Sequence, residues 1–239
     1  MDLELDHTAD AISARLAKGA RPNYLRDWIY GGIDGAVTTF AIVAGVVGAQ
    51  LSMSIILILG LANLLADGFS MAASNYSGTK TELDDLERLR EIERQHIQQV
   101  PDGEVEEIRQ ILRGKGLRGN ALEETVSAIV SNEETWIDTM LTEEYGMSLT
   151  LRSPSKSAFA TFSAFIICGA VPLLPFLLPF ADPFTTSSVF TAIVFFLIGA
   201  IKSRWSLAPW WRSALETLII GLLAAGAAYY VGYLLKDIS

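Results

Sequence analysis

Long apolar runs alternate with polar stretches along this chain, and five of the runs are long enough to cross a membrane. A bilayer core of about 30 Å needs roughly 20 helical residues. Because lipid offers the backbone no hydrogen-bond partners, each run is predicted to be a helix. The predicted spans are residues 28–50, 54–76, 158–180, 184–201 and 211–235.

Prolines in the third span and glycines in the first add local features to these predicted helices. Pro172 and Pro175 should kink or break the third span, since proline removes a backbone donor. Gly31 and Gly35 form a small-xxx-small pair that lets helix backbones approach closely. Packing within one chain and dimerisation explain that pair equally well. Before the first span, residues 10–20 predict a short amphipathic helix.

Residues 77–157 form a polar insert with 17 of the 27 acidic residues and ten Lys or Arg. The insert predicts helices over 79–99, 103–113 and 121–145, the last with Asn120 as N-cap and Glu123 as its reciprocal partner. The predicted fold is an all-α membrane protein, with five transmembrane helices and a three-helix cytoplasmic metal-binding domain between helices 2 and 3. The predicted regions are an N-terminal segment 1–27, spans 1 and 2 (28–76), the insert (77–157) and spans 3 to 5 (158–239).

Lys and Arg placement predicts the orientation, because cytoplasmic loops carry the excess of positive charge. Cations precede the first and third spans and lie around the connection between the fourth and fifth. The opposite connections carry none. The N-terminus and the insert are therefore expected in the cytoplasm of a multi-pass protein. The acidic residues 1–20 do not read as a signal peptide. We expect a bacterial inner membrane, with an endomembrane as the alternative.

Several carboxylates of the insert share helix faces with other potential metal ligands. Residues three or four apart point the same way on a helix. Carboxylate, imidazole and thioether groups together suit a divalent first-row metal such as Fe²⁺, Mn²⁺ or Zn²⁺. The alternative is an ordinary solvated helical surface. The candidate ligands are Glu93, His96, Glu104, Glu107, Met140 and Glu144.

Two aspartates lie inside predicted spans, where an ionised carboxylate is costly. Asp34 and Asp67 fall at similar depth on neighbouring antiparallel spans, and no Lys or Arg lies within a span to neutralise them. Asn63, Asp67 and Met71 form a stripe at four-residue spacing. These groups suit a transient site for a transition-metal ion that competes with protons. The alternative is a neutral Asp hydrogen-bonded to a neighbouring helix.

Three stretches resemble the vacuolar iron transporter and yeast calcium-cross-complementer family of Fe²⁺/Mn²⁺ transporters, in its bacterial form. They are DGAVTTFAIVAGV at 34–46, ANLLADGFSMAASNY at 62–76 and PLLPF at 172–176. The similarity runs from about residue 23 to the C-terminus. Five helices with an acidic insert between the second and third are also the layout of that family.

The resemblance implies a homodimer with its ion pathway at the dimer interface, lined by residues matching Asp34 and Met71. It also implies export of the metal from the cytoplasm in exchange for protons. The insert resembles the family's metal-binding domain, whose two Glu-x-x-Glu pairs match Glu93/His96 and Glu104/Glu107. His96 stands where the family usually has Glu. Leu141 stands where the family's third helix can carry a second Met, after Met140 and before Glu144.

These observations predict a proton-coupled Fe²⁺/Mn²⁺ exporter, with Zn²⁺ or Co²⁺ as further cargo. The rival reading is a membrane-anchored metal-binding, storage or sensing protein without transport. An enzyme is not expected: a di-iron site would need a second Glu-x-x-His element, and the only other histidine is His7. The expected partners are the lipid bilayer, metal ions, protons and a second copy of the chain. No prosthetic group and no nucleic acid are expected.

Overall fold

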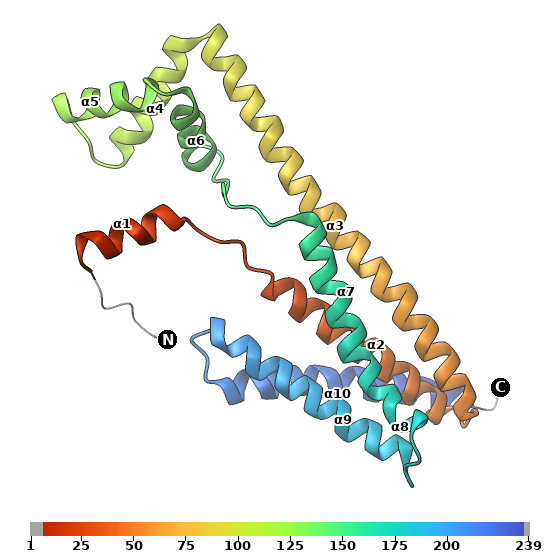
Figure 1. Ribbon diagram of the computed structural model, residues 1–239. Helices are drawn as coiled ribbons and strands as arrows, with labels where there is room; N and C mark the ends of the chain where they lie inside the picture. Colours follow the sequence, from red (N-terminus) through yellow and green to blue (C-terminus); the bar gives the residue numbers. More distant parts are fainter. Residues whose placement is uncertain (1–6, 237–239) are drawn as a thin grey trace. The chain divides into compact units, whose positions relative to one another are not determined.

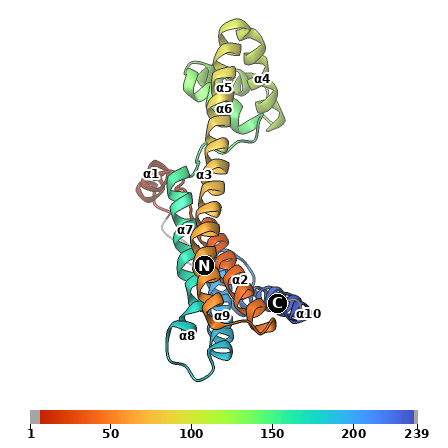
Figure 2. The same cartoon turned by 90° about the vertical axis from the view of Figure 1, so that its right-hand side faces the viewer.

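The computed structural model describes residues 7–236, and within them the chain forms helices and no strand (Figure 1). The chain divides into two compact units. The membrane unit comprises residues 7–19, 23–77 and 154–236, and the inserted unit comprises residues 20–22 and 78–153. Helix α3 (Met53–Gln99) contributes residues to both units and is unbroken along its length (Figure 2).

Five helices of the chain are long and apolar enough to cross a membrane, which confirms the prediction of five helices that could span it. The short N-terminal helix α1 (Ala9–Lys18) is also present, as the amphipathic pattern predicted. The 3-10 turn η2 (Ser203–Trp205) follows the fourth span. The spans are α2 (Leu25–Gly48), the first part of α3, α7 with its continuation (Pro154–Leu177), α9 (Pro183–Lys202) and α10 (Trp210–Leu235).

The third span is interrupted where its prolines lie, as predicted. Helix α7 (Pro154–Ala170) ends before Pro172, and a 3-10 turn, η1 (Val171–Leu173), replaces the regular helix. A single further turn, α8 (Leu174–Leu177), includes Pro175. The missing proline N–H and the ring clash with the preceding turn account for this break.

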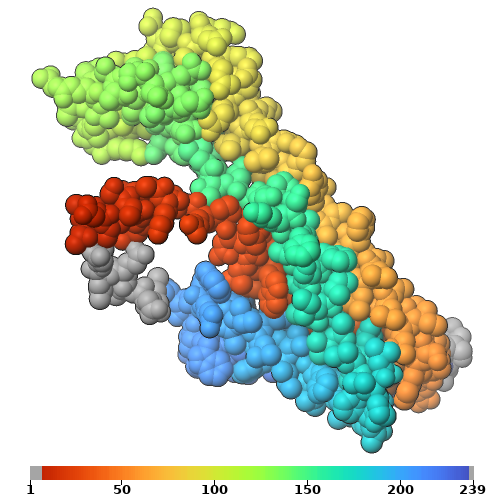
Figure 3. Space-filling view, viewed as in Figure 1, coloured from red at the N-terminus to blue at the C-terminus, as the bar shows by residue number. Residues whose placement is uncertain are grey.

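Helix α2 packs against α7 within the same chain, and Figure 3 shows the two segments adjoining each other. A Cβ atom added at Gly31 would lie 2.1 Å from the carbonyl oxygen of Thr161. One added at Gly35 would lie 2.3 Å from the carbonyl oxygen of Phe165. Such distances leave room only for hydrogen, so both glycines are required for the α2–α7 contact. The close approach predicted from this pair is therefore made inside the monomer.

The inserted unit consists of the C-terminal part of α3 followed by three short helices. Two clusters of buried apolar side chains hold it together, one around Ile108 and Trp136 and the other around Leu86 and Ile137. Each short helix is amphipathic and turns its apolar face to these clusters, which is the usual source of stability for helices of this length. The three helices are α4 (Pro101–Gly114), α5 (Gly119–Val130) and α6 (Glu133–Glu143).

The predicted single helix over 121–145 is wrong, because α5 and α6 are separate helices. Short polar side chains interrupt the chain between them. The Ser131 hydroxyl donates to the carbonyl of Ala128, and the Asn132 side chain accepts from the backbone N–H of Thr135. Such local bonds compete with a continuous helix. The predicted N-cap at Asn120 is also wrong: α5 begins at Gly119, and Asn132 caps α6 instead.

Candidate functional site

Three potential metal ligands converge in the inserted unit, where the end of α3 meets the start of α4. The ligand atoms of Glu93, His96 and Glu104 all lie within 4.8 Å of one another. His96 Nδ1 is 3.6 Å from Glu93 Oε1 and 3.5 Å from Glu104 Oε1. Ligands at about 2.0–2.2 Å from a first-row metal ion lie at most about 4.4 Å apart, so a small closure would suffice. Helical spacing alone linked Glu93 to His96; the turn at Val100 brings Glu104 to them.

Both carboxylates of this cluster are buried and incompletely satisfied. Glu93 is 1% exposed and Glu104 is 4% exposed. Among the described residues, neither Oε2 atom has a hydrogen-bond partner. Burial, reinforced by the negative charges of Glu107 and Glu93, raises the pKa of Glu104 to about 7. Two buried carboxylate oxygens that lack a donor are costly in an empty site and suit a cation.

Tyr145 is a member of this cluster that the sequence reasoning missed. Its hydroxyl donates a 2.8 Å hydrogen bond to Glu93 Oε1. Burial and this bond raise the pKa of Tyr145, so the phenol stays a proton donor. The bond fixes the orientation of the Glu93 carboxylate, and it uses only Oε1, so Oε2 remains without a donor among the described residues. The only sequence signal was its place directly after the candidate ligand Glu144.

The other predicted ligands of the insert have different surroundings. Glu107 and Glu144 are exposed, and their charges act on Glu104. Although Glu144 as a whole is exposed, desolvation of its carboxyl group and the negative charges of Glu107 and Glu93 raise the pKa of Glu144. Met140 is fully buried in the apolar cluster around Ile108. Glu107 and Glu144 therefore border the three-ligand cluster, whereas the Met140 side chain packs in the core.

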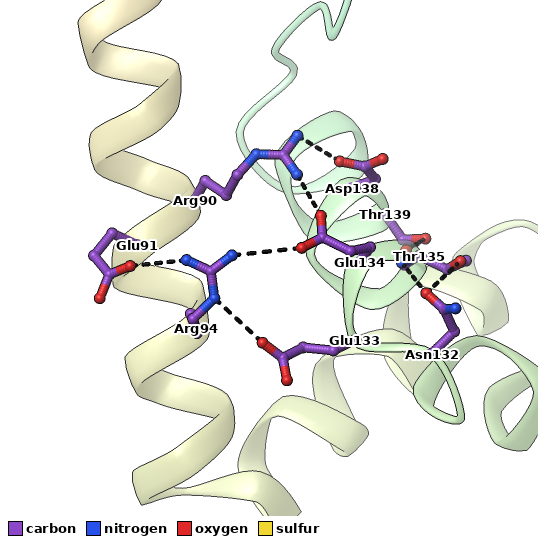
Figure 4. Close-up of polar contacts among 9 residues, drawn as sticks. All are labelled: Arg90, Glu91, Arg94, Asn132, Glu133, Glu134, Thr135, Asp138 and Thr139. Carbon is purple, nitrogen blue, oxygen red and sulfur yellow. Dashed lines mark hydrogen bonds and ion pairs between the residues drawn. The ribbon is translucent and has the colours of Figure 1, made fainter.

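A network of ion pairs between Arg side chains of α3 and carboxylates of α6 holds these two helices together in the inserted unit (Figure 4). Arg90 lies 2.9 Å from Glu134 and 2.6 Å from Asp138. Arg94 lies 3.2 Å from Glu133 and 3.5 Å from Glu134. Because Tyr145 and Glu144 follow directly after α6, these pairs help to hold both residues beside the ligand cluster.

In the membrane unit, Asp34 and Met71 line one open groove of about 480 Å³. Tyr30, Ile33 and Val37 complete its lining. The groove thus places one carboxylate and one thioether on a mainly apolar wall within the spans. A carboxylate and a thioether are ligands that first-row transition metals accept.

Asn63 and Asp67 lie along the same face of α3. The Asn63 amide donates to the hydroxyl of Thr38 at 3.2 Å, and that hydroxyl donates to the carbonyl oxygen of Asp34 at 2.9 Å. Asp67 is half-buried and close enough to Asp34 for their charges to interact. Asn63 therefore connects α3 to the turn that carries Asp34, and Asp67 lies beside the groove.

A third polar contact between these helices was missed from the sequence. Asp27 is 1% exposed, and the amide of Asn75 donates to its Oδ1 atom at 2.9 Å. The same amide lies 2.6 Å from the hydroxyl of Thr161 on α7. Asn75 continues the four-residue stripe of Asn63, Asp67 and Met71, which was the available signal. Asp27 precedes the predicted first span by one residue, so the apolar pattern did not mark it as buried.

Comparisons with known proteins show the family of this chain. The family model described as "VIT family" matches residues 25–233, which include both spans of the groove and the insert. A vacuolar iron transporter 1 from Arabidopsis thaliana is 35% identical over 86% of this chain and 83% of its own length. One from Tulipa gesneriana is 36% identical over 86% and 84%. A vacuolar iron transporter from Toxoplasma gondii is 32% identical over 90% and 75%. The chain belongs to the VIT family.

Proposed function

We propose that this protein transports a divalent transition-metal ion, Fe²⁺ or Mn²⁺, across the membrane, outward from the cytoplasm and in exchange for protons. The named relatives are iron transporters, and a transporter family favours this role over an enzyme. The observation that carries the proposal is the groove in which Asp34 and Met71 lie together inside the spans. A storage or sensing protein would need metal ligands only outside the membrane.

The inserted unit supplies the capture step of this proposal. Glu93, His96 and Glu104 would bind the ion, and Glu107 and Glu144 would add negative charge around it. The supporting observation is the pair of buried Oε2 atoms, on Glu93 and Glu104, that lack a donor among the described residues. An imidazole among carboxylates favours Fe²⁺, Co²⁺ or Zn²⁺ more than an all-carboxylate site would.

Proton exchange is proposed from the proximity of two carboxylates in the membrane unit. Asp34 and Asp67 would repel each other if both were ionised without a counter-ion. A divalent cation at the groove relieves that repulsion, and protons relieve it when the cation leaves. Ion and protons would then occupy the same oxygens in turn, which couples their movements in opposite directions.

A second copy of the chain is proposed as the cover of the groove. In the single chain the groove is open and the carboxylate of Asp34 is only half-buried. A carboxylate facing hydrocarbon is costly, and carboxylates in spans normally face a partner or a water-filled path. A homodimer that places two such grooves face to face would double the ligands around the ion.

The test is metal flux into proteoliposomes containing the full chain. Asp34→Asn should lower the Fe²⁺ or Mn²⁺ flux by at least about 100-fold, because losing a charged ligand costs several kcal/mol and 1.4 kcal/mol is tenfold. Met71→Leu should lower it by about 10-fold. Met53→Leu is the matched control, since Met53 is exposed at the start of α3 and away from the groove. An imposed pH gradient should drive the flux in the wild type.

Two outcomes would reject the proposal. If Asp34→Asn leaves the flux unchanged while the protein still binds metal, the pathway assignment is wrong. If the wild type binds metal but shows no flux under any pH gradient, the protein is a membrane-anchored metal-binding or storage module.

A further inference from the structure

A separate cavity of about 430 Å³ lies in the membrane unit where α2 begins and α9 ends. Its lining includes two cationic side chains, Arg26 and Lys202, and two aromatic ones, Tyr30 and Trp205. Two apolar residues, Leu25 and Ile29, and two polar ones, Asn23 and Ser206, complete the lining. None of these groups except Tyr30 borders the groove of Asp34, so the cavity has its own chemistry.

Both cations are able to accept an anionic partner. The Arg26 guanidinium lies over the ring of Tyr30 at 5.2 Å, which fixes its position at the cavity. Lys202 Nζ is 3.5 Å from Glu216, whose side chain is 61% exposed, so this pair is long and solvated. The neighbouring Asp27 is buried and accepts from Asn75. The positive end of the α2 dipole adds to the potential of the two cations.

The position of the cavity relates it to the bilayer surface. The first span begins at Leu25, and the fourth span with its following turn η2 ends at Trp205, so this end of both helices lies at a membrane boundary. Tyr30 and Trp205 are both more than half exposed. Exposed aromatic residues at span ends lie at the level of the lipid headgroups. Basic pockets between membrane helices at this level suit anionic headgroups.

We propose that this cavity binds an anionic phospholipid. The phosphate would lie between Arg26 and Lys202, and the first carbons of an acyl chain would lie along Leu25 and Ile29. The chain carries a formal net charge of −9, so the molecule as a whole repels anions. The attraction for an anion at this cavity therefore comes from its local cations, Arg26 and Lys202. The bound lipid would join the start of α2 to the end of α9.

The experiment uses the full chain purified in detergent, with phosphatidylglycerol or phosphatidylcholine added. Native mass spectrometry should show phosphatidylglycerol retained at least about 10-fold better than phosphatidylcholine, and only phosphatidylglycerol should raise the melting temperature. Arg26→Gln with Lys202→Gln should abolish this preference. Arg204→Gln is the matched control: it removes a cation two residues from Lys202 that does not line the cavity.

The charge-conserving pair Arg26→Lys with Lys202→Arg covers the case in which the neutral pair fails to fold, and it should keep the preference. Equal retention of the two lipids by the wild type would overturn the proposal. Retention unchanged in the folded Gln pair would also overturn it, as would loss of the preference in Arg204→Gln alone. If inorganic phosphate gives the same melting-temperature rise as phosphatidylglycerol, the site is one for free phosphate and the lipid proposal is wrong.

Discussion

The two units of this protein differ in the groups that contact their carboxylates. In the membrane unit, Asp27 is held by the neutral amide of Asn75, and the backbone beside Asp34 is held through Thr38 and Asn63. In the inserted unit, the carboxylates that join α6 to α3 are paired with arginine. Glu93 and Glu104, in contrast, face His96, and neither forms an ion pair with an arginine within residues 7–236.

This difference separates carboxylates that build the fold from carboxylates left free for a ligand. An arginine beside a carboxylate neutralises it and occupies its oxygens, as at Glu134 and Asp138. Glu93 is held by the neutral hydroxyl of Tyr145, and its Oε2 atom has no hydrogen-bond partner among the described residues. The insert contains both kinds within one small unit, and their positions distinguish its scaffold from its candidate metal site.

The largest loss of stability is expected from adding a side chain where α2 packs against α7 in the membrane unit. Gly35→Ala would place a methyl group 2.3 Å from a backbone carbonyl oxygen, which cannot yield as a side chain can. We expect a loss of at least about 3 kcal/mol, at the upper end of overpacking effects. Thermal unfolding in detergent measures it, with loss of monodisperse protein as the extreme result.

Gly78→Ala is the matched control in the inserted unit. A Cβ at Gly78 meets nothing within 4 Å, so alanine should stabilise α3 by about 0.5–1 kcal/mol. If Gly35→Ala is as well tolerated as Gly78→Ala, then α2 and α7 do not pack as closely as described.

The second prediction concerns the unpaired carboxylates of the insert. Because the folded pKa of Glu104 is raised to about 7, its favourable contribution is present at low pH and is lost as the pH rises through 7. Glu104→Gln should therefore stabilise the metal-free protein at pH 8 by about 1–3 kcal/mol and have little effect at pH 4.5. The same change should weaken metal binding by about 10-fold or more. Thermal melts across pH and isothermal titration measure the two effects.

Glu106→Gln provides a control of opposite sign. A hydrogen bond from Arg109 lowers the pKa of Glu106, so its contribution is present at neutral pH and lost on acidification. Neutralising it should lower the melting temperature at pH 8. A Glu104→Gln variant that is also less stable at pH 8 would show that Glu104 has a cationic partner.

A smaller effect is expected on metal preference. His96→Glu restores an all-carboxylate cluster, so the ratio of Co²⁺ to Mn²⁺ affinity should fall by about 10-fold. His96→Gln removes the imidazole without adding charge and should weaken Co²⁺ more than Mn²⁺. The absorption spectrum of bound Co²⁺ provides a direct readout of the nitrogen ligand. An unchanged spectrum in His96→Gln would exclude His96 as a ligand.

The smallest change in stability is expected from breaking the ion-pair network between α3 and α6. Arg90→Gln removes the contacts to Glu134 and Asp138 and should lower the melting temperature by about 2–5 °C, since exposed pairs contribute little. The difference should shrink at about 0.5 M salt. Arg88→Gln is the control, because Arg88 pairs with Asp85 inside α3 and joins no helices. If Arg90→Gln lowers the melting temperature no more than Arg88→Gln does, the ion-pair network does not hold α6 against α3.

Helical spacing in the sequence predicted which side chains share one face of a helix. It did not predict which residues of other helices that face contacts. Glu93 and His96 were recognised as neighbours because they lie one turn apart on one helix. The joining of Glu104 to them depends on the turn at Val100, and the bond from Tyr145 depends on how α6 packs. Met140 shared a face with Glu144, yet its side chain lies in the apolar cluster.

The sequence by itself determined the five spans, the break at Pro172, the polar insert and the family. Each of these depends on local properties: the length of an apolar run relative to the bilayer, the missing donor of proline, and matched motifs. Only the tertiary structure decided that Gly31 and Gly35 pack against α7, that Asp27 pairs with Asn75, and that one long predicted helix is two. These outcomes depend on contacts between residues far apart in the chain, and spacing along one helix carries no information about them.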